Sequence, residues 1–311
     1  MTNIKNPNAN TITPSNTTGL FLYMASIIRR LRQNGQLRTA ETYQSALNSF
    51  RRFRNCKDLR LADIESNTMQ DYQAWLRSND LTQNTISFYL RILRATYNRA
   101  VDEDLISDRR PFRRVYTGID KTFKRALPLT VIKKIYRLDL SDSPELDFAR
   151  DMFIISFMLR GMSFIDMAYL LKSDLCGGYI TYRRSKTGQQ LNIQWTSKMA
   201  AILSKYPENR SPYLLPIIRR DDINPRYAYK NMGYNINHNL KRIAKLLNIP
   251  IPLTLYVARH SWASAAQSKG IPLPLISEGL GHDNQVTTQI YLASLDTSAI
   301  DQANSLILRD L

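Results

Sequence analysis

Residues 279–291 read Gly-Leu-Gly-His-Asp-Asn-Gln-Val-Thr-Thr-Gln-Ile-Tyr, so a tight turn and a histidine precede a tyrosine at short spacing. Gly281 permits the turn because glycine has no Cβ. His282 can donate a proton or a hydrogen bond near neutral pH, and Tyr291 can act as a covalent nucleophile. An isolated tyrosine in such a setting is more often a half-buried helix residue. The stretch therefore needs a second motif before it indicates a reaction.

That second motif lies upstream, where residues 256–263 read Tyr-Val-Ala-Arg-His-Ser-Trp-Ala. Here an Arg-His pair, Arg259 and His260, opens an apolar helical run. The chain has three histidines, and two of them fall inside the two motifs. In this order and separation, the motifs resemble the C-terminal half of the tyrosine recombinase (phage integrase) family, whose members cut and rejoin DNA through a phosphotyrosine.

Composition favours a nucleic-acid partner. The 311 residues carry a formal charge of +17, and 43% are hydrophobic, which is enough for a packed core. Clustered Lys and Arg gain affinity for DNA by releasing counterions from its phosphates. The apolar run at 152–159 is too short to span a bilayer, and residues 2–18 lack an apolar signal segment. We therefore expect no membrane association and a cytoplasmic, nucleoid-associated protein.

The two cysteines, Cys56 and Cys176, form no CxxC or Cys/His pattern. A disulfide framework and a structural zinc site are therefore not expected. We predict neither a metal nor another cofactor.

The N-terminal half is predicted to be helical. Residues 1–18 form a polar tail, and 19–112 show three apolar stripes at helical spacing. Thr39, Thr68 and Thr82 are the expected helix starts. The stripes comprise Tyr43, Leu47 and Phe50, then Met69, Tyr72 and Leu76, then Ile86, Tyr89 or Leu90, Leu93 and Tyr97.

Basic residues lie on the opposite faces of these helices, at Arg51, Arg52, Arg54, Arg91, Arg94 and Arg99. Such a face is usually solvated surface. Two of them in one small helical unit are interpreted here as phosphate contacts. Residues 113–126 are basic and poor in periodic apolar positions, which predicts an interdomain linker with DNA contacts at Lys121, Lys124 and Arg125.

The second domain is predicted at 127–311. Thr130 is a candidate helix cap, and Ser143-Pro144 starts a helix that runs to Leu159 and stops at Gly161. Residues 180–184 and 190–195 are predicted strands joined by a turn. The expected fold is mainly α with a small β-sheet. It resembles the family's N-terminal helical core-binding (SAM-like) domain followed by an α+β tyrosine-recombinase catalytic domain.

The resemblance implies roles for individual residues. Tyr291 stands at the nucleophile's position, Arg259 at the second catalytic arginine, and His282 at the histidine or tryptophan that contacts the scissile phosphate. Lys186, at the tip of the hairpin, matches the lysine that protonates the leaving oxygen, although an ordinary turn lysine would look the same. His260 more often supports such a site than performs chemistry. Further DNA contacts are expected at Arg183, Arg184 and His260.

Two positions depart from the family pattern. Tyr256 replaces a histidine three residues before Arg259, and a phenol is a poorer base than imidazole near neutral pH. Ser163 stands where the first catalytic arginine is expected, and Ser163 with Asp166 makes a variant capping box. Arg160 is the nearest substitute for the missing charge, with Arg183 or Arg184 as alternatives. Asp166 matches the acidic partner of the first arginine.

The predicted function is a site-specific recombinase that works through a 3′-phosphotyrosyl intermediate, in integration, excision or inversion. The motifs also resemble those of Bacteroides-type recombinases and DNA invertases. The alternatives are a type IB topoisomerase-like enzyme and a catalytically impaired DNA-binding regulator. The expected partners are double-stranded recombination sites, copies of the chain in a tetramer on paired sites, and an accessory DNA-bending protein. An apolar stripe near the C-terminus, at Ile300, Leu306, Ile307 and Leu308, is interpreted as an assembly tail that reaches a neighbouring protomer, with docking onto the same subunit as the alternative.

Overall fold

The computed structural model describes residues 18–120, 125–220, 223–282, 284 and 288–289. The chain divides into two compact units at residues 121/122, and each has a hydrophobic core of its own. Tyr291, Lys121, Lys124 and the predicted tails at both ends lie outside the described residues. Within the described part, no helix combines the length and the apolar character needed to cross a bilayer.

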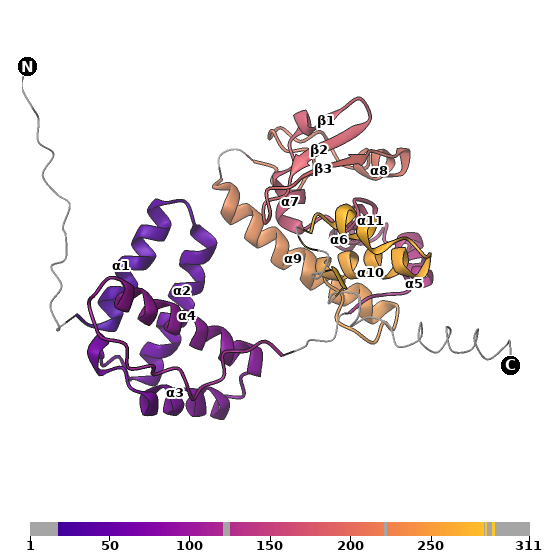
Figure 1. The fold of residues 1–311 in the computed structure, drawn as a ribbon. Coiled ribbons are helices and arrows are strands. Elements are labelled where there is room, and N and C mark those ends of the chain that lie inside the picture. The colour runs from indigo at the N-terminus through magenta and orange to yellow at the C-terminus, as the bar shows by residue number, and fades with distance from the viewer. Residues whose placement is uncertain (1–17, 121–124, 221–222, 283, 285–287, 290–311) are drawn as a thin grey trace, which may run out of the picture. The chain divides into compact units, whose positions relative to one another are not determined.

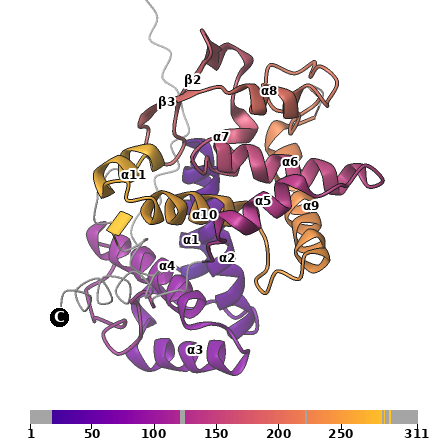
Figure 2. The same ribbon diagram turned by 90° about the vertical axis from the view of Figure 1, so that its right-hand side faces the viewer.

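The first unit contains α1 (Leu20–Gln33), α2 (Leu37–Phe53), α3 (Ser66–Ser78) and α4 (Gln83–Asp102), with a 3-10 turn at Leu61–Asp63. Figures 1 and 2 show α1 and α2 packed along each other. The predicted apolar stripes lie in this core, and Leu90 rather than Tyr89 is fully buried. The sequence analysis did not identify α1 as a helix of its own. The buried face of α1 completes the core.

Of the four threonines expected to start helices, the structure confirms one and corrects three. Thr82 does cap α4, where its side chain accepts a hydrogen bond from the Thr85 backbone N–H. Thr39 and Thr68, however, lie inside the first turns of α2 and α3, and Thr130 lies inside α5 (Leu129–Arg137). Leu129, at the start of α5, is partly buried against the second core, and this packing outweighs a capping preference of about 1 kcal/mol.

Residues 113–120, the first part of the expected linker at 113–126, are tied to the first unit. Phe112 and Val115 are buried in the first core. The Tyr116 backbone N–H donates to Gln73 Oε1 at 2.7 Å, and the Asp120 N–H donates to Asn84 Oδ1 at 2.9 Å. Residues 113–120 therefore belong to the first unit, held by hydrogen bonds that a charge and periodicity pattern does not reveal.

The second unit surrounds one buried helix, α6 (Pro144–Met158). It starts after Ser143 with Pro144 in its first turn, as predicted, and almost every side chain from Leu146 to Ser156 is buried. Helices α5, α8 (Ser197–Leu203), α9 (Pro225–Leu246) and α10 (Leu255–Ser268) pack against it. Figure 2 shows α10 beside α6, which places the end of α6 close to α10.

The sheet of this unit has three antiparallel strands within the described residues: β1 (Leu175–Cys176), β2 (Tyr179–Arg183) and β3 (Gln190–Gln194). The register pairs Ile180 with Ile193 and Arg183 with Gln190. Both predicted strands are confirmed to within one residue, and β1 is an addition. Ile180, Tyr182, Leu191 and Ile193 face the core, since side chains alternate along a strand.

Two short helices complete the unit. α7 (Phe164–Tyr169) follows the end of α6, and α11 (Leu273–Leu280) packs on α10 around a small cluster that includes Ala263, Ala266, Ile276 and Leu280. A 3-10 turn at Lys172–Asp174 leads into the sheet. Figure 1 shows α11 next to α10.

Candidate active site

The turn that ends α11 directs His282 into the unit. Gly281 is in the left-handed conformation at φ +65°. Its N–H donates to Glu278 O at 2.9 Å, and the His282 N–H donates to Ser277 O at 3.0 Å, the pattern of a Schellman cap. A Cβ on Gly281 would meet Leu191 Cδ1 at 3.0 Å and Arg184 Cδ at 3.1 Å. Glycine therefore both shapes the turn and lets it approach β3.

Arg259 joins three segments of the unit. It lies on α10 and is 4% exposed. Nη1 donates to Gly161 O at 3.0 Å and Nη2 to Leu280 O at 2.5 Å, while Nη2 also lies 3.1 Å from His282 Nε2. The two sequence motifs thus meet at one guanidinium. This fork, fixed by carbonyls, is suited to an anionic group with several oxygens.

The end of α6 has an unusual backbone. Arg160 and Gly161 both have positive φ, at +57° and +72°, and the Gly161 N–H donates to Ser156 O at 2.8 Å. A left-handed non-glycine residue is uncommon and is often found at functional sites. A Cβ on Gly161 would lie 2.5 Å from Arg259 Cα. The turn therefore brings Arg160 next to the segment that holds Arg259.

His282 is linked on both sides of its ring. Nδ1 lies 2.7 Å from Thr288 Oγ1, and that hydroxyl donates to Ser277 Oγ at 2.9 Å. Burial, together with the positive charges of Arg259, Arg184 and Lys186, lowers the pKa of His282 from 6.5 to about 4, and burial is the largest cause. The imidazole is consequently neutral near pH 7 in the DNA-free protein.

The turn between β2 and β3 adds positive charge beside His282. Arg184 is 7% exposed, and its Nη1 donates to Gly281 O. Its backbone N–H closes the turn by donating to Gln189 O at 2.8 Å. Lys186 is exposed on the same turn, and its charge acts on His282. Arg183 is exposed as well, with Nη1 3.3 Å from Gly188 O.

Tyr182 lies where these charges converge. Burial raises the pKa of its phenol above the usual range and the Asp166 carboxylate adds to this shift. The charges of Arg259, Arg184 and Arg160 act in the opposite direction. Since such effects fall off with distance, all three guanidinium groups lie near one buried phenol. Sequence reasoning did not single out Tyr182, because its inward alternation on β2 looks like ordinary core.

Ser163 occupies the N-cap position of α7, but the expected capping box does not form, because its side chain makes no hydrogen bond to the helix backbone. It precedes α7, and its hydroxyl donates to Asp166 Oδ2 at 2.6 Å. Asp166 Oδ1 accepts from the Ser185 N–H at 2.8 Å, so this carboxylate ties α7 to the turn that carries Lys186. Because position 163 carries serine, the Asp166 carboxylate accepts hydrogen bonds from a hydroxyl and from a backbone N–H.

Other predicted residues are placed apart from this cluster. Tyr256 is 58% exposed at the start of α10 and packs edge-on against His260, with ring centroids 4.6 Å apart. His260 is buried. Arg125 is exposed ahead of α5. The hydroxyls of Thr288 and Ser277 were missed; the threonine pair between His282 and Tyr291 was a sequence signal for Thr288, and Ser277 had none.

The arginines of the first unit have varied surroundings. Arg51 and Arg52 are exposed, and Arg51 lies over the Phe21 ring at 5.1 Å. Arg54 and Arg91 are partly buried. Arg99 Nε donates to Glu103 at 2.9 Å, so a carboxylate of this unit already offsets its charge.

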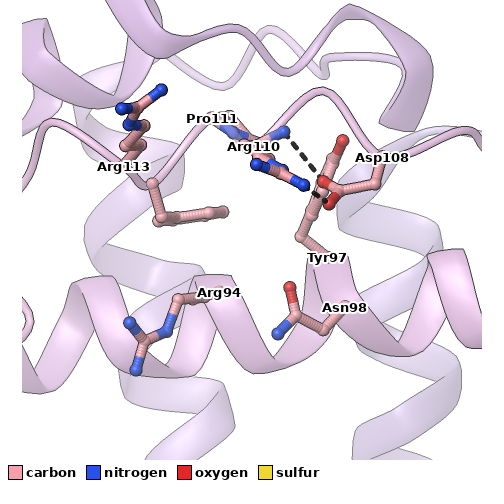
Figure 3. Close-up of a pocket in the computed structure, with 8 residues that line it drawn as sticks. Arg94, Tyr97, Asn98, Asp108, Arg110, Pro111 and Arg113 are labelled. Carbon is pink, nitrogen blue, oxygen red and sulfur yellow. Dashed lines mark hydrogen bonds and ion pairs between the residues drawn. The ribbon is translucent and has the colours of Figure 1, made fainter.

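A pocket of about 200 Å³ lies between α4 and the segment at 108–113 of this unit. Figure 3 shows the residues that line it. Arg94 lines it from the helix and Arg113 from the segment. Asp108 accepts from the Arg110 N–H at 2.8 Å and lies 3.9 Å from its guanidinium. Arg94 is exposed and also donates to Thr117 Oγ1 at 2.8 Å. Three arginines and one aspartate line the pocket, so its net charge is positive.

Comparison with known proteins gives a consistent result for both units. Residues 19–115 match the phage integrase SAM-like domain, and residues 138–298 match the phage integrase family. The tyrosine recombinase XerA of Thermococcus kodakarensis is 25% identical over 234 residues, which cover 74% of this chain and 77% of XerA.

Solved structures share the fold. A lambda integrase fragment (residues 75–356), a dimer bound to a COC′ core site, has a TM-score of 0.68 at 17% identity, covering 88% of this chain and 95% of that chain. A lambda integrase tetramer bound to a Holliday junction has a TM-score of 0.65 at 18% identity, covering 87% and 79%. A Tn1549 transposon integrase in complex with a circular intermediate DNA also has a TM-score of 0.65, at 14% identity, covering 93% and 99%.

Proposed function

Because this chain belongs to the phage integrase family and is a site-specific tyrosine recombinase, we propose that it cleaves and rejoins DNA through a 3′-phosphotyrosyl bond at Tyr291. The observation that carries the proposal is the junction of the two motifs at Arg259. Its guanidinium is buried, fixed by two carbonyls and 3.1 Å from His282 Nε2. This is a preorganised donor group of the kind that stabilises charge developing on a phosphoryl group.

Each group has one proposed task. The Tyr291 phenol gives its proton to water while its oxygen attacks the scissile phosphorus, and the bond to the 5′-oxygen breaks. Arg259 and His282 bind the non-bridging oxygens, whose charge grows in the transition state. Lys186, exposed on the β2–β3 turn, donates the proton that the leaving 5′-oxygen takes up. Tyr256, three residues before Arg259 and exposed, donates a hydrogen bond to a phosphate where its relatives carry histidine.

We propose Arg160 as the substitute for the arginine that Ser163 replaces. Its left-handed backbone turns it away from the α6 axis, and its charge acts on the same buried Tyr182 as Arg259 does. Arg184 is the alternative. Its Nη1 is held by Gly281 O, which favours a supporting task in the turn beside His282.

Neither a metal ion nor ATP is required in this scheme. The tyrosyl ester conserves the energy of the broken phosphodiester, so a 5′-hydroxyl can reverse the step. Guanidinium and lysine charges supply the electrostatic stabilisation that a metal would supply elsewhere.

Assembly and DNA binding follow from the same family. Since lambda integrase forms a tetramer on a Holliday junction, we propose that this chain also acts as a tetramer on paired sites. An accessory DNA-bending protein and a nucleoid location in the cytoplasm are part of the proposal. The proposed phosphate contacts are Arg51, Arg52, Arg54, Arg91, Arg94, Arg99, Lys121, Lys124, Arg125, Arg183, Arg184 and His260.

The test is capture of the covalent intermediate. The full chain is incubated in EDTA, without ATP, with nicked duplexes whose flanking sequence is randomised, and denatured protein is then recovered with its attached DNA. We expect DNA linked through its 3′-phosphate, with one enriched sequence, and none with Tyr291→Phe. Retention of adducts by Tyr291→Phe would move the nucleophile elsewhere, and no adduct with the unaltered chain would overturn the proposal.

A further inference from the structure

A chain of hydrogen bonds leads from the guanidinium of Arg259 to the interior of the unit. Its links are Arg259 Nη2 to His282 Nε2 at 3.1 Å, His282 Nδ1 to Thr288 Oγ1 at 2.7 Å, and Thr288 Oγ1 to Ser277 Oγ at 2.9 Å. Thr288 is fully buried and Ser277 is 3% exposed. These two hydroxyls have no part in the proposed chemistry, although they reach its histidine.

The direction of these bonds follows from the chemistry of the first one. A guanidinium has donors and no acceptor. His282 Nε2 must therefore accept, and in the neutral ring the proton then sits on Nδ1. The Nδ1–H donates to Thr288 Oγ1, and the Thr288 hydroxyl proton is directed to Ser277 Oγ, so every link has one donor and one acceptor.

Backbone geometry reinforces the arrangement. Ser277 holds the His282 backbone through its carbonyl at 3.0 Å, and its hydroxyl accepts from Thr288. Both the main chain and the ring of His282 are thus anchored on one residue of α11. Thr288 lies three residues before Tyr291 in the sequence, so the same bond connects the segment leading to the nucleophile with His282.

We propose that Thr288 is a positioning residue, an inference that rests on the proposed function. By accepting a hydrogen bond from Nδ1–H, Thr288 fixes the His282 ring so that Nε2 faces the Arg259 guanidinium, where the scissile phosphate is proposed to bind. Nε2 is then the only ring atom that changes protonation. Burial supports this assignment, because a protonated nitrogen inside the unit needs an acceptor or costs about 1–3 kcal/mol.

The His282 ring then has two hydrogen-bonding states. Without DNA, Nε2 accepts from Arg259. When a phosphate enters, its oxygens take the Arg259 donor, and Nε2 gains a proton from solvent and donates to the phosphate. Among the described residues, Arg259 on α10 and Arg184 and Lys186 on the β2–β3 turn act on the ring, all with positive charge. Only an anion can offset them, so the bond from Nδ1 to Thr288 persists while Nε2 responds to the ligand.

The first measurement is made on the DNA-free full chain and does not depend on activity. Nitrogen-15 NMR of labelled histidines reads three rings, and His282→Gln identifies the signal. We expect Nδ1 protonated, with its proton protected from solvent exchange at pH 7. Thr288→Ser keeps this signal, whereas Thr288→Val loses the protection. A proton on Nε2, or equal protection in Thr288→Val, overturns the proposal.

The second measurement asks whether Thr288 acts through His282. Cleavage of the nicked duplex should fall roughly 10- to 100-fold in Thr288→Val, since small misplacement of a reacting group costs that much, and less than about twofold in Thr288→Ser. In a His282→Gln background, Thr288→Val should add less than about twofold. An equal loss in both backgrounds means that Thr288 serves the fold alone, and the proposal fails.

Folding is checked by thermal melting of each variant. If Thr288→Val does not fold, Ser277→Ala takes its place: it removes the next acceptor and should weaken protection of the Nδ1 proton, while Thr288→Ser should not. Unchanged protection in Ser277→Ala would then count against the chain of bonds. If the unaltered protein shows the expected NMR signal but no covalent adduct, the proposed function fails and the assignment of Thr288 to the ring stands.

Discussion

Gly161 lies against the backbone of Arg259, 98 positions along the chain. A Cβ on Gly161 would be 2.5 Å from Arg259 Cα, and the Gly161 carbonyl accepts from Arg259 Nη1 at 3.0 Å. The turn after α6 therefore sets the position of a side chain on α10. This contact explains why a glycine stands beside a left-handed arginine at the end of a buried helix.

Gly161→Ala should destabilise the second unit and reduce cleavage. A left-handed alanine costs about 1–3 kcal/mol, and here the backbone of α10 must also move. Gly270→Ala is the matched control, because Gly270 has φ +71° with nothing within 4 Å of an added Cβ. Chemical denaturation should show the larger loss for Gly161→Ala. Equal losses of stability in the two variants would mean that the close approach to Arg259 adds nothing to the cost of the substitution.

Arg259→Lys should lose most of the cleavage rate although it keeps the charge. An ammonium cannot reproduce the planar fork that reaches Gly161 O and Leu280 O. Loss of one donor aimed at transition-state charge costs about 3 kcal/mol, a factor in the hundreds. The measurement is single-turnover cleavage, with exposed Arg137→Lys as control. A rate near that of the unaltered chain would remove Arg259 from the mechanism.

Lys186→Ala should be rescued by a better leaving group. If Lys186 protonates the 5′-oxygen, a substrate with sulfur in that bridging position needs no acid, since a thiolate leaves unaided. We expect a large defect on the oxygen substrate and a small one on the sulfur substrate, with exposed Lys198→Ala close to the unaltered chain on both. Matching defects on the two substrates would leave Lys186 as a phosphate contact only.

Much of this site could be predicted from local sequence because its elements are local. The helix α6 between Ser143 and Gly161, the two predicted strands and the turn at Gly281 all carry their own backbone signals. The bond from His282 to Thr288 could not be predicted, because it depends on the rotamer of a buried hydroxyl. The placement of residues 113–120 was also missed, since an amide such as Gln73 pairs with a distant backbone without any periodic pattern.

The low pKa of His282 predicts a pH dependence of stability. Its folded value of about 4 lies below the unfolded value of 6.5, so the unfolded chain binds more protons between these values. Stability should therefore fall as pH drops from 6.5 to 4. Allowing for partial exposure of the ring, the loss is about 1–2 kcal/mol. Denaturation across this range should show a smaller fall in His282→Gln; identical curves would mean that the ring is not desolvated.

The residue that replaces the first catalytic arginine can be identified by removing each candidate arginine and by placing an arginine at position 163. Arg160→Ala should lower single-turnover cleavage by about 100-fold or more with little change in stability, because Arg160 is only partly buried. Arg184→Ala should instead destabilise the unit by about 1–3 kcal/mol, since it leaves Gly281 O without this donor. Ser163→Arg in the Arg160→Ala background should recover at least tenfold, because it returns a guanidinium beside Asp166. Cleavage unaffected by Arg160→Ala, or lost in an Arg184→Ala protein of normal stability, would assign the missing charge to Arg184.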